Sequence, residues 1–407
     1  MSEPVSEQAP AAPPIFAEIT AESVRAALLA AVQDPTAMTH SWLFTGPPGS
    51  GRSVAAKIFA TALVCPNGGC GACDSCRSAA AGSHPDILWV STTGSVIPVQ
   101  EVREVVLEAA KLPGVSDWRV VVVEDADRLN ESGANALLKS VEEPPSHTVF
   151  LLCTPSTDPT DIAITLRSRC RHIYVPTPSR QEVEQVLLSD ASLNLSAEQA
   201  SWAAGVSGGH IGRARRLAQD ETSRKKRATA LKLPQLVYEP GAVYRFTAEL
   251  VTQATAEAAS SLEARDEREM AELEASLGMG SKGKGVAKAQ RGSAGQINAL
   301  EKEQGARRKR MMRDSLDLAL IDVAGLYRDA MMLAAGAVDE EGAPVGGFQH
   351  PDMAATSKEL ARRNSPEAMV RCIDAVAECR ETLKLNVRPE VALDAMAGRL
   401  RECCAVV

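Results

Sequence analysis

The sequence has few aromatic residues and no long uncharged apolar run. Phe, Trp and Tyr make up 3% of the 407 residues, so any core must be built mainly from aliphatic side chains. The longest apolar runs are far shorter than the roughly 18 residues of a membrane-spanning helix, which argues against a helical membrane protein. Hydrophobic residues nevertheless reach 45%, which supports real cores and excludes a chain that is disordered throughout.

The sequence also lacks a basic excess. Its formal net charge is −8, whereas proteins that coat nucleic acid by bulk charge are usually basic overall. This charge argues against such a coating role and leaves room for a local DNA-binding patch. The segment 1–14 is rich in Pro and Ala and has neither the basic nor the apolar stretch of a secretory signal. We therefore expect a disordered leader over 1–14 and a cytoplasmic protein.

Ten cysteines are present, and four of them crowd into residues 65–76. In a reducing compartment such a cluster indicates metal or redox chemistry rather than structural disulfides. The spacing is C-x₄-C-x₂-C-x₂-C, and four thiolates can close a tetrahedral Zn²⁺ site. We expect a structural zinc module, with an iron–sulfur cluster as the alternative, and small hydrophobic roles for the other six cysteines. The metal ligands would be Cys65, Cys70, Cys73 and Cys76.

Short apolar runs alternate with helical patterns over residues 15–178. The run at 119–123 is rich in β-branched residues, which is typical of strands, and the segments between the runs have helical spacing. Strands that alternate with helices in this way form a parallel sheet in an α/β domain. The expected strands are 41–45, 87–90, 119–123, 148–153 and 172–175, and the expected helices are 17–36, 54–63, 99–112 and 134–141.

The remainder of the chain is expected to be helical. Ser179 and Ser196 are each followed three residues later by Glu or Gln, which is the spacing of a capping box. A later stretch rich in Gly, Ser and Lys is expected to be a flexible loop inside a charged insertion. The expected boundaries are 179–222 for a small helical domain, 236–405 for a larger one, 278–295 for the loop and about 257–313 for the insertion.

A glycine-rich loop follows the first expected strand and opens the next helix. It reads Gly-Pro-Pro-Gly-Ser-Gly-Arg-Ser over 46–53, which is the spacing of a phosphate-binding P-loop except at one position. Arg52 stands where the motif has lysine, and its longer planar head contacts phosphates differently. We expect ATP hydrolysis to be impaired even where binding survives; a chance glycine-rich loop is the alternative. The binding residues would be Gly46, Gly49, Ser50, Gly51, Arg52 and Ser53, with Ser53 holding Mg²⁺.

An apolar strand that ends in acids follows at 119–127 and has the Walker B pattern. In that pattern the acids position Mg²⁺ and a water-activating base. The usual order is Asp then Glu, whereas here Glu124 precedes Asp125. The acid at the base position is therefore one methylene short, and such a displacement matters for catalysis. An ordinary strand end with solvated acids is the alternative.

Three short basic segments could contact phosphate. Arg169, within 166–171, could reach a neighbouring subunit's nucleotide as an arginine finger. Arg213 lies at the glycine-rich start of a helix and could point back at a nucleotide. The third segment, 307–313, lies on a charged helix. A solvated basic surface is the alternative for each; for 307–313 it is the favoured interpretation, and contact with DNA is the other.

Together these motifs resemble the bacterial clamp-loader AAA+ proteins, most closely those of the delta-prime type in DNA polymerase III. The resemblance includes the strand from His40 into the P-loop, the cysteine module after the P-loop helix, and His-Pro-Asp at 84–86. The most specific stretch is Ala-Asn-Ala-Leu-Leu-Lys-Ser-Val-Glu-Glu-Pro-Pro at 134–145. Ser-Arg-Cys at 168–170 is similar to the family's arginine-finger motif. The resemblance covers roughly 15–220 of the chain.

The resemblance implies a three-part architecture. An α/β P-loop AAA+ domain with a parallel sheet and an inserted zinc module (15–178) would precede a small helical lid and an all-α collar through which five subunits form a ring. It also implies roles for single residues: Arg169 as the finger in trans, Thr154 as the sensor after the fourth strand, Arg213 as the lid sensor, and the four cysteines as zinc ligands. The family's usual Gly-Gln before the first helix is absent here.

Two related roles in this family differ in the condition of the ATP site. The motor subunit, gamma/tau, would keep the P-loop lysine and the Asp-Glu pair, whereas the delta-prime stator often loses both and keeps its finger. Arg52 and the inverted pair Glu124–Asp125 therefore predict a stator with weak or absent ATPase activity, within the DNA polymerase III holoenzyme. Its expected partners are gamma/tau, delta, the sliding clamp and primer–template DNA in a hetero-oligomeric ring. The alternatives are an ATP-hydrolysing motor subunit and a free-standing AAA+ repair ATPase.

Overall fold

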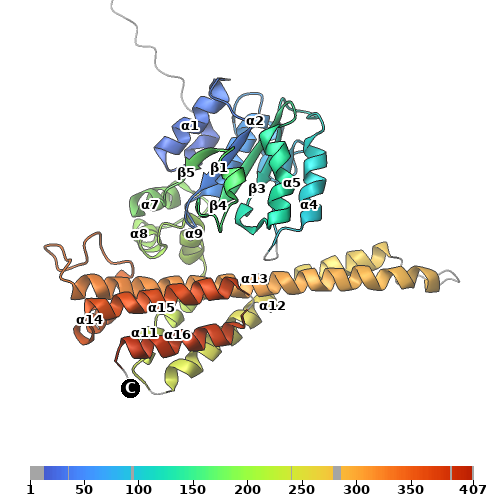
Figure 1. The fold of residues 1–407 in the computed structure, drawn as a ribbon. Coiled ribbons are helices and arrows are strands. Elements are labelled where there is room, and N and C mark those ends of the chain that lie inside the picture. The colour runs from blue at the N-terminus through green and yellow to red at the C-terminus, as the bar shows by residue number, and fades with distance from the viewer. Residues whose placement is uncertain are drawn as a thin grey trace, which may run out of the picture. The chain divides into compact units, whose positions relative to one another are not determined.

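The computed structural model describes residues 13–34, 36–92, 96–239, 241–277, 286–385 and 387–405, without the side chains of 286–293. The chain divides into two compact units, one ending at Ala218 and the other beginning at Gln219. Most of the expected leader, 1–12, lies outside the described residues. Figure 1 shows the α/β unit and the helical unit, which are described separately below.

The first unit is built on a five-stranded parallel sheet. Its order is β2-β3-β4-β1-β5, and neighbouring strands pair in parallel. Every residue of β1, β3 and β4 is buried, which explains their near-continuous apolar sequences, because helices cover both faces of a parallel sheet. The expected α/β fold is confirmed. The strands are β1 (Ser41–Thr45), β2 (Ile87–Val90), β3 (Arg119–Val123), β4 (Thr148–Thr154) and β5 (Arg171–Tyr174).

Helices cover both faces of this sheet, and alternate strand residues supply the two cores. Trp42 and Phe44 of β1 pack with Phe59 of α2, while Leu43 faces the opposite core with Phe150. Figure 1 shows α1 and α2 on one side and α4 and α5 on the other. The helices are α1 (Glu22–Gln33), α2 (Arg52–Val64), α3 (Asp74–Ala80), α4 (Val99–Ala109), α5 (Glu131–Glu142) and α6 (Ile164–Arg167), with 3-10 turns η1 (Pro14–Glu18) and η2 (Ala126–Arg128).

The expected helix at 17–36 is shorter than predicted. The 3-10 turn η1 occupies its first part, and α1 begins only at Glu22. Pro13 and Pro14 start the turn, and Phe16 within it is fully buried in the core with α2. Burial of this aromatic ring fixes the entry of the chain and separates the turn from the helix that follows.

Three helices complete the first unit as a small lid. They are α7 (Arg180–Ser189), α8 (Ala197–Val206) and α9 (Ile211–Gln219), packed around a small aliphatic core. Both predicted capping boxes are present, at Ser179 with Glu182 and at Ser196 with Gln199. The compact unit ends at Ala218 rather than at the expected 222.

In the described part of the second unit the regular elements are helices, and one isolated bridge joins Val338 and Pro344. The unit begins at Gln219 rather than at the expected 236. The reason is the buried Arg227, whose guanidinium binds Asp352 at 2.6 Å and donates to Nδ1 of His350 at 2.8 Å. Its helices are α10 (Glu221–Ala230), α11 (Leu233–Leu236), α12 (Ala242–Ser276), α13 (Val286–Ala334), α14 (Ala354–Arg363), α15 (Pro366–Lys384) and α16 (Pro389–Cys403), with a 3-10 turn η3 (Pro351–Met353).

The charged insertion is mostly helical, as expected for its flanks 257–277 and 296–313, and the difference from the expectation lies in the loop between them. Helix α12 continues to Ser276 and α13 begins at Val286, so the predicted loop at 278–295 is helical in its second half. Residues 278–285 lie outside the described part of the chain. Ala, Lys, Gln and Arg near 286–295 favour a helix. Ion pairs then link the two helices, with Arg308 Nε 2.7 Å from Asp266 and Arg307 against Glu269; Figure 1 shows the helices side by side.

Among the described residues, none of the helices is both long enough and apolar enough to cross a membrane.

Candidate nucleotide site and cysteine module

Most of the predicted nucleotide-binding residues meet at the carboxyl edge of the sheet. The P-loop follows β1, the acids follow β3, and Thr154 ends β4. These three strands are neighbours, with Thr45 opposite Thr154 and Val123 opposite Leu152. In open parallel sheets the crevice at the carboxyl ends of the strands is the usual ligand site.

The P-loop has the backbone of a phosphate cradle. Gly49 and Gly51 have φ of +89° and +88°, a region that residues with a β-carbon rarely adopt. The Ser50 N–H donates to the Pro47 carbonyl at 3.0 Å and tightens the turn. Gly51 is the N-cap of α2, so the positive end of that helix opens into the loop. This geometry can hold an anion.

Arg52 bends back onto its own loop. Its Nη1 donates to the Gly46 carbonyl at 2.8 Å. Its buried Nε has no hydrogen-bond partner among the described residues, and the same is true of the Ser50 hydroxyl, which is 2% exposed. Buried polar atoms without partners carry an energetic cost. The loop therefore fits a phosphate, which would supply acceptors for both groups.

The acids after β3 form a charged cluster near Arg52. Asp125 lies 3.9 Å from Arg128 Nε. Burial, and then the charge of Asp125, raise the pKa of Asp127, while Arg128 and Arg52 oppose the rise. Sequence reasoning selected Glu124 and Asp125 and did not single out Asp127. The signal that could have found it is the alternation of acids in Glu-Asp-Ala-Asp directly after a buried strand.

Cys153, opposite Phe44 in the sheet, lies near Arg52 and the acids that follow β3. It is fully buried, and burial raises the pKa of its thiol to about 12, which the charge of Arg52 opposes. The charges of Glu124 and Asp125 favour the neutral thiol as well. Cys153 belongs to the aliphatic core with Phe59, so it fills the small hydrophobic role predicted for it.

Thr154 is fully buried at the end of β4. Its hydroxyl makes long contacts with the carbonyls of Ser156, at 3.4 Å, and Asp161, at 3.5 Å. The threonine is therefore at the predicted edge, with its hydroxyl engaged by the loop that follows the strand. Its role as a sensor stays a prediction.

The lid meets the P-loop through His210. A β-carbon built on Gly49 would lie 2.6 Å from Cγ of His210, so the imidazole packs directly against the loop. Arg213 is 9% exposed, and its backbone N–H donates to Nδ1 of His210 at 3.3 Å. Sequence reasoning selected Arg213 and missed His210, although the histidine directly follows two glycines at the start of the helix.

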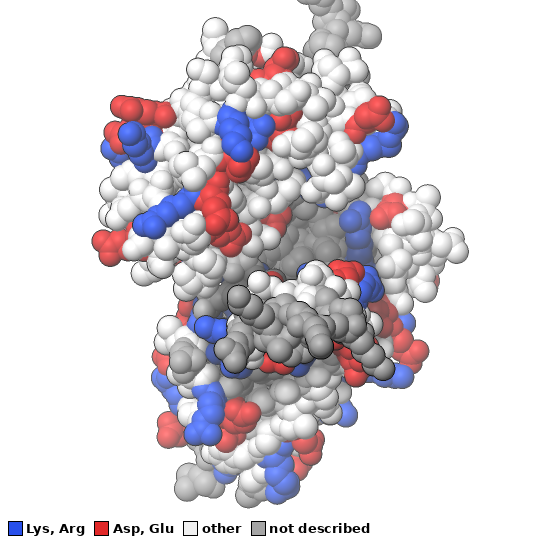
Figure 2. Space-filling model, turned by 90° about the vertical axis from the view of Figure 1, so that its right-hand side faces the viewer, with Lys and Arg blue, Asp and Glu red and all other residues white. Residues whose placement is uncertain are grey.

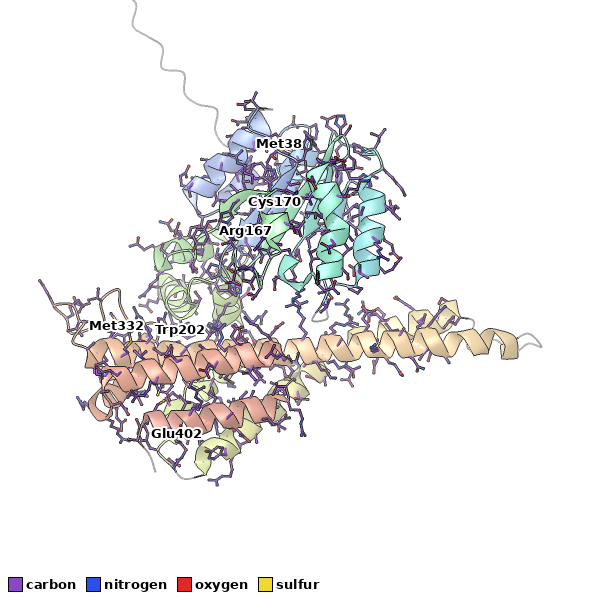
Figure 3. The ribbon with its side chains drawn as sticks, in the orientation of Figure 1. Met38, Arg167, Cys170, Trp202, Met332 and Glu402 are labelled. Atoms are coloured by element: carbon purple, nitrogen blue, oxygen red, sulfur yellow. The ribbon has the colours of Figure 1, made fainter. Side chains whose placement is uncertain are left out.

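Arg169 lies at the opposite edge of the sheet from the P-loop. It precedes β5, whose first residue, Arg171, pairs with Trp42 at the amino end of β1. Its guanidinium binds Glu142, at the end of α5, at 3.0 Å, and also donates to the Thr165 carbonyl at 3.0 Å. Figure 3 labels the neighbouring Arg167 and Cys170.

The length of strand β1 sets the separation between Arg169 and the P-loop. The P-loop begins after Thr45, the carboxyl end of β1, and four residues of strand span roughly 13 Å at about 3.3 Å per residue. The Arg169 side chain is 34% exposed. Arg169 therefore belongs to a different part of the surface from the chain's own phosphate cradle, whereas the P-loop, the acids, Thr154 and the lid helix come together.

The four clustered cysteines form a compact thiol site. Their sulfur atoms all lie within 4.8 Å of one another. Gly68, Gly69 and Gly71 between them have positive φ, which allows the tight turns. Backbone N–H groups donate to the sulfurs, for example Gly71 to Cys76 at 3.3 Å and Cys76 to Cys73 at 3.4 Å.

The environment of the thiol site favours thiolates at its exposed side. Backbone donors from Ala72 and Cys73 lower the pKa of Cys70 to about 6. Burial instead raises the pKa of Cys76. The donor set of four convergent sulfurs fits a tetrahedral metal ion with no open coordination position. These residues, predicted from spacing alone, could hold a structural metal.

The described residues on the face drawn in Figure 2 show charges of both signs. On the face drawn in Figure 2, Lys and Arg side chains alternate with Asp and Glu among the described residues, without a broad field of one sign. Within the predicted basic segment 307–313, Arg307 is buried against Asp266 and Glu269. Arg308 also pairs with Asp266, and Arg310 lies 3.7 Å from Asp314. Much of this segment's charge is therefore used within the protein.

Comparison with known proteins gives consistent matches. Residues 23–179 match the protein family described as DNA polymerase III, delta subunit. The chain is 36% identical over 168 residues to DNA polymerase III subunit gamma/tau of Mycobacterium tuberculosis, covering 39% of this chain and 28% of that protein. It is 37% identical over 145 residues to DNA polymerase III subunit delta' of Pseudomonas aeruginosa, covering 34% of this chain and 44% of that protein.

The chain thus spans less than half the length of these relatives. Among solved structures, a DNA polymerase III gamma subunit-related protein of Thermotoga maritima aligns with 94% of this chain and 100% of its own, at 15% identity and a TM-score of 0.37.

Proposed function

We infer that this chain, a member of the clamp-loader AAA+ family of DNA polymerase III, is the delta-prime, or stator, subunit of its complex. In this role it hydrolyses little or no ATP itself and offers Arg169 to the ATP site of a neighbouring subunit. Its partners would be gamma/tau and delta in a hetero-oligomeric ring that places the sliding clamp on primer–template DNA. The family match over residues 23–179 supports the complex, and the geometry of the first unit supports the role within it.

The observation that carries this proposal is the position of Arg169. Because it lies at the amino edge of the sheet, it is separated by the length of β1 from the chain's own P-loop at the carboxyl edge. A phosphate that Arg169 contacts would therefore belong to another molecule. Its pairing with Glu142 holds the guanidinium at the surface, where a neighbour can reach it. An arginine supplied in trans can account for a factor of about 10³–10⁵ in phosphoryl-transfer rates.

The condition of the chain's own site also supports the stator role. Arg52 binds the Gly46 carbonyl of its own loop, whereas a P-loop lysine reaches the β- and γ-phosphates. The acid at the base position is Asp125, which is shorter than the usual Glu and lies near Arg128. Both departures weaken hydrolysis more than they weaken binding, because the backbone cradle is retained.

Reconstitution with the gamma/tau and delta subunits tests this proposal. Arg169→Ala should lower the DNA-stimulated ATPase of the complex to the level left by the sites that do not use this arginine. Arg167→Ala is the matched control, since Arg167 lies on the same segment and donates to the Thr157 carbonyl of its own chain. An ATPase rate that is unchanged by Arg169→Ala would refute the trans role.

A second candidate is an ATP-hydrolysing motor subunit. The identity to a gamma/tau protein and the retained glycine geometry of the P-loop favour it. This alternative predicts steady ATP turnover by the purified chain alone, abolished by Asp125→Asn. The stator proposal predicts no turnover above background in the same assay. A free-standing repair ATPase, the third possibility, would not co-purify with polymerase III subunits.

The cysteine module is proposed to hold one Zn²⁺ in a structural role. Four sulfurs within 4.8 Å match the donor set that closed zinc sites use. In this position the metal would fix the turn between α2 and α3 and would take no part in nucleotide chemistry.

A further inference from the structure

The contact between His210 and the P-loop suggests a function that is separate from the proposed role of Arg169. Gly209 fixes the histidine's position: it has φ of +84°, and a β-carbon there would lie 2.7 Å from the Pro178 carbonyl. The imidazole then fills the space beside Gly49, where a β-carbon would lie 2.6 Å from its Cγ and 2.7 Å from its Cδ2. The lid is therefore in direct contact with the phosphate cradle through an ionisable ring.

The protonation state of this ring follows from its hydrogen bond. Nδ1 of His210 accepts from the backbone N–H of Arg213 at 3.3 Å, so in the neutral ring the single proton is on Nε2. Uptake of a second proton at Nδ1 ends this bond, because a protonated ring nitrogen only donates. Burial, followed by the charges of Arg213, Arg216 and Arg52, lowers the pKa of His210. The ring is therefore neutral near pH 7 while the cradle contains no anion.

An anion in the cradle changes this balance. Besides burial, the charges of three arginines act on the ring: Arg213 and Arg216 on α9, which begins at the next residue, and Arg52 on α2. A polyphosphate beside them would favour the charged ring, since an opposite charge nearby stabilises the protonated form of histidine. It would also accept the hydrogen bonds that the Arg52 Nε and the Ser50 hydroxyl lack among the described residues.

We propose that His210 recognises phosphate in the P-loop site, taking up a proton from solvent at Nδ1 when a nucleotide polyphosphate enters and donating to it from the charged ring. The proposal requires nucleotide binding by this chain. It requires neither hydrolysis nor the trans role of Arg169.

The sign of the resulting pH dependence is fixed by linkage. If the bound form has the higher histidine pKa, binding takes up protons, and the affinity for the polyphosphate rises as the pH falls through that value. Above the bound-state pKa this contribution is absent, and below the free-state pKa it is complete. One linked proton can change the affinity by at most about tenfold per pH unit.

Titration calorimetry with Mg²⁺ and ATP between pH 6 and pH 8 tests the proposal. His210→Asn is the informative variant, because asparagine is also a good helix cap and does not titrate. The wild-type affinity should rise more steeply than that of His210→Asn as the pH falls. In buffers with different ionisation enthalpies, the wild type should take up more protons than the variant. The titration of ATP itself is common to both proteins and cancels in this comparison.

His147→Asn is the matched control and should behave as the wild type. His147 is an exposed histidine of the same unit with φ of +65°, a conformation that asparagine tolerates. Equal slopes and equal proton uptake in the wild type and His210→Asn would overturn the proposal. Failure of the wild-type chain to bind Mg²⁺ and ATP anywhere in this pH range would also overturn it. Neither result would affect the role of Arg169, which is measured by the ATPase rate of the assembled complex.

Discussion

The P-loop and Arg169 lie at opposite ends of the strands of the central sheet. At the carboxyl edge the P-loop keeps its glycine geometry, but Arg52 bends back to the Gly46 carbonyl. At the amino edge Arg169 is surface-exposed and held by Glu142. The candidate nucleotide site and the arginine proposed to act on a neighbour are therefore separated by the length of β1. A substitution can damage one and leave the other intact, so the two can be tested independently.

The largest expected effect concerns the cysteine module, which belongs to neither edge. Cys76→Ser, or treatment with a strong zinc chelator, should release about one zinc per chain, because a closed tetrahedral site needs all four thiolates. Structural zinc in small zinc-finger peptides contributes roughly 10–16 kcal/mol. We therefore expect residues 65–80 to become sensitive to limited proteolysis. Plasma emission analysis measures the metal, and iron or no metal in the intact protein would contradict the zinc assignment.

The next largest effect is expected at the carboxyl edge alone and concerns nucleotide binding. Gly49→Ala should abolish nucleotide binding, because its φ of +89° disfavours a β-carbon and the added atom would meet His210 at 2.6 Å. Such strain costs on the order of 1–3 kcal/mol of stability. Equilibrium denaturation and nucleotide titration measure both changes.

Gly82→Ala is the control for Gly49→Ala. Gly82 also has positive φ, of +72°, but a β-carbon there meets no atom within 4 Å. It should cost backbone strain alone and leave nucleotide binding unchanged. Equal loss of binding in the two variants would mean that the contact with His210 is unimportant.

A smaller effect tests how the amino edge presents its arginine. Glu142→Gln removes the charge 3.0 Å from Arg169. The pair is partly exposed, so stability should change by less than about 1 kcal/mol. The ATPase rate of the reconstituted complex should fall by a few fold, because the guanidinium is no longer held in place. Glu143→Gln, one residue further along, should have no comparable effect; equal effects would assign Glu142 no positioning role.

The smallest effect concerns Arg52→Lys, which restores the common P-loop residue. It removes the hydrogen bond to the Gly46 carbonyl and leaves the ammonium group of the lysine available to a phosphate. Mg²⁺ and ATP should therefore bind more tightly. Turnover by the chain alone should stay at background, because Glu124 and Asp125 remain inverted. Measurable ATPase activity of Arg52→Lys would show that the lysine position alone had silenced the site.

Sequence patterns predicted the sheet well because its strands are buried on both faces. The strands 41–45, 87–90 and 119–123 were predicted at their observed bounds, since an apolar run between turn residues marks a buried strand. The extent of α13 was not predicted, because Gly and Ser near 286–295 are typical of loops. Its more C-terminal part is stabilised by pairs between α12 and α13, such as Arg307 with Glu269, that join residues far apart in sequence.

In the candidate site, too, local motifs were predicted and contacts between distant residues were not. The P-loop and the four cysteines are local motifs, and spacing alone identified them. The contact of His210 with Gly49 joins residues that are far apart in the sequence of the first unit. The pair of Arg169 and Glu142 likewise joins residues from different elements. Neither contact leaves a signal in a local pattern, so only the fold could reveal them. The roles of Thr154 and Arg213 stay predictions.

The most direct test compares the two edges within one assembled complex on primed DNA. Clamp loading and ATPase rate are measured with the wild type, Arg169→Ala and Gly49→Ala. The account predicts that Arg169→Ala lowers both rates and that Gly49→Ala leaves both near the wild-type level. A complex that tolerates Arg169→Ala but fails with Gly49→Ala would contradict it, because the chain's own nucleotide site would then be the working one.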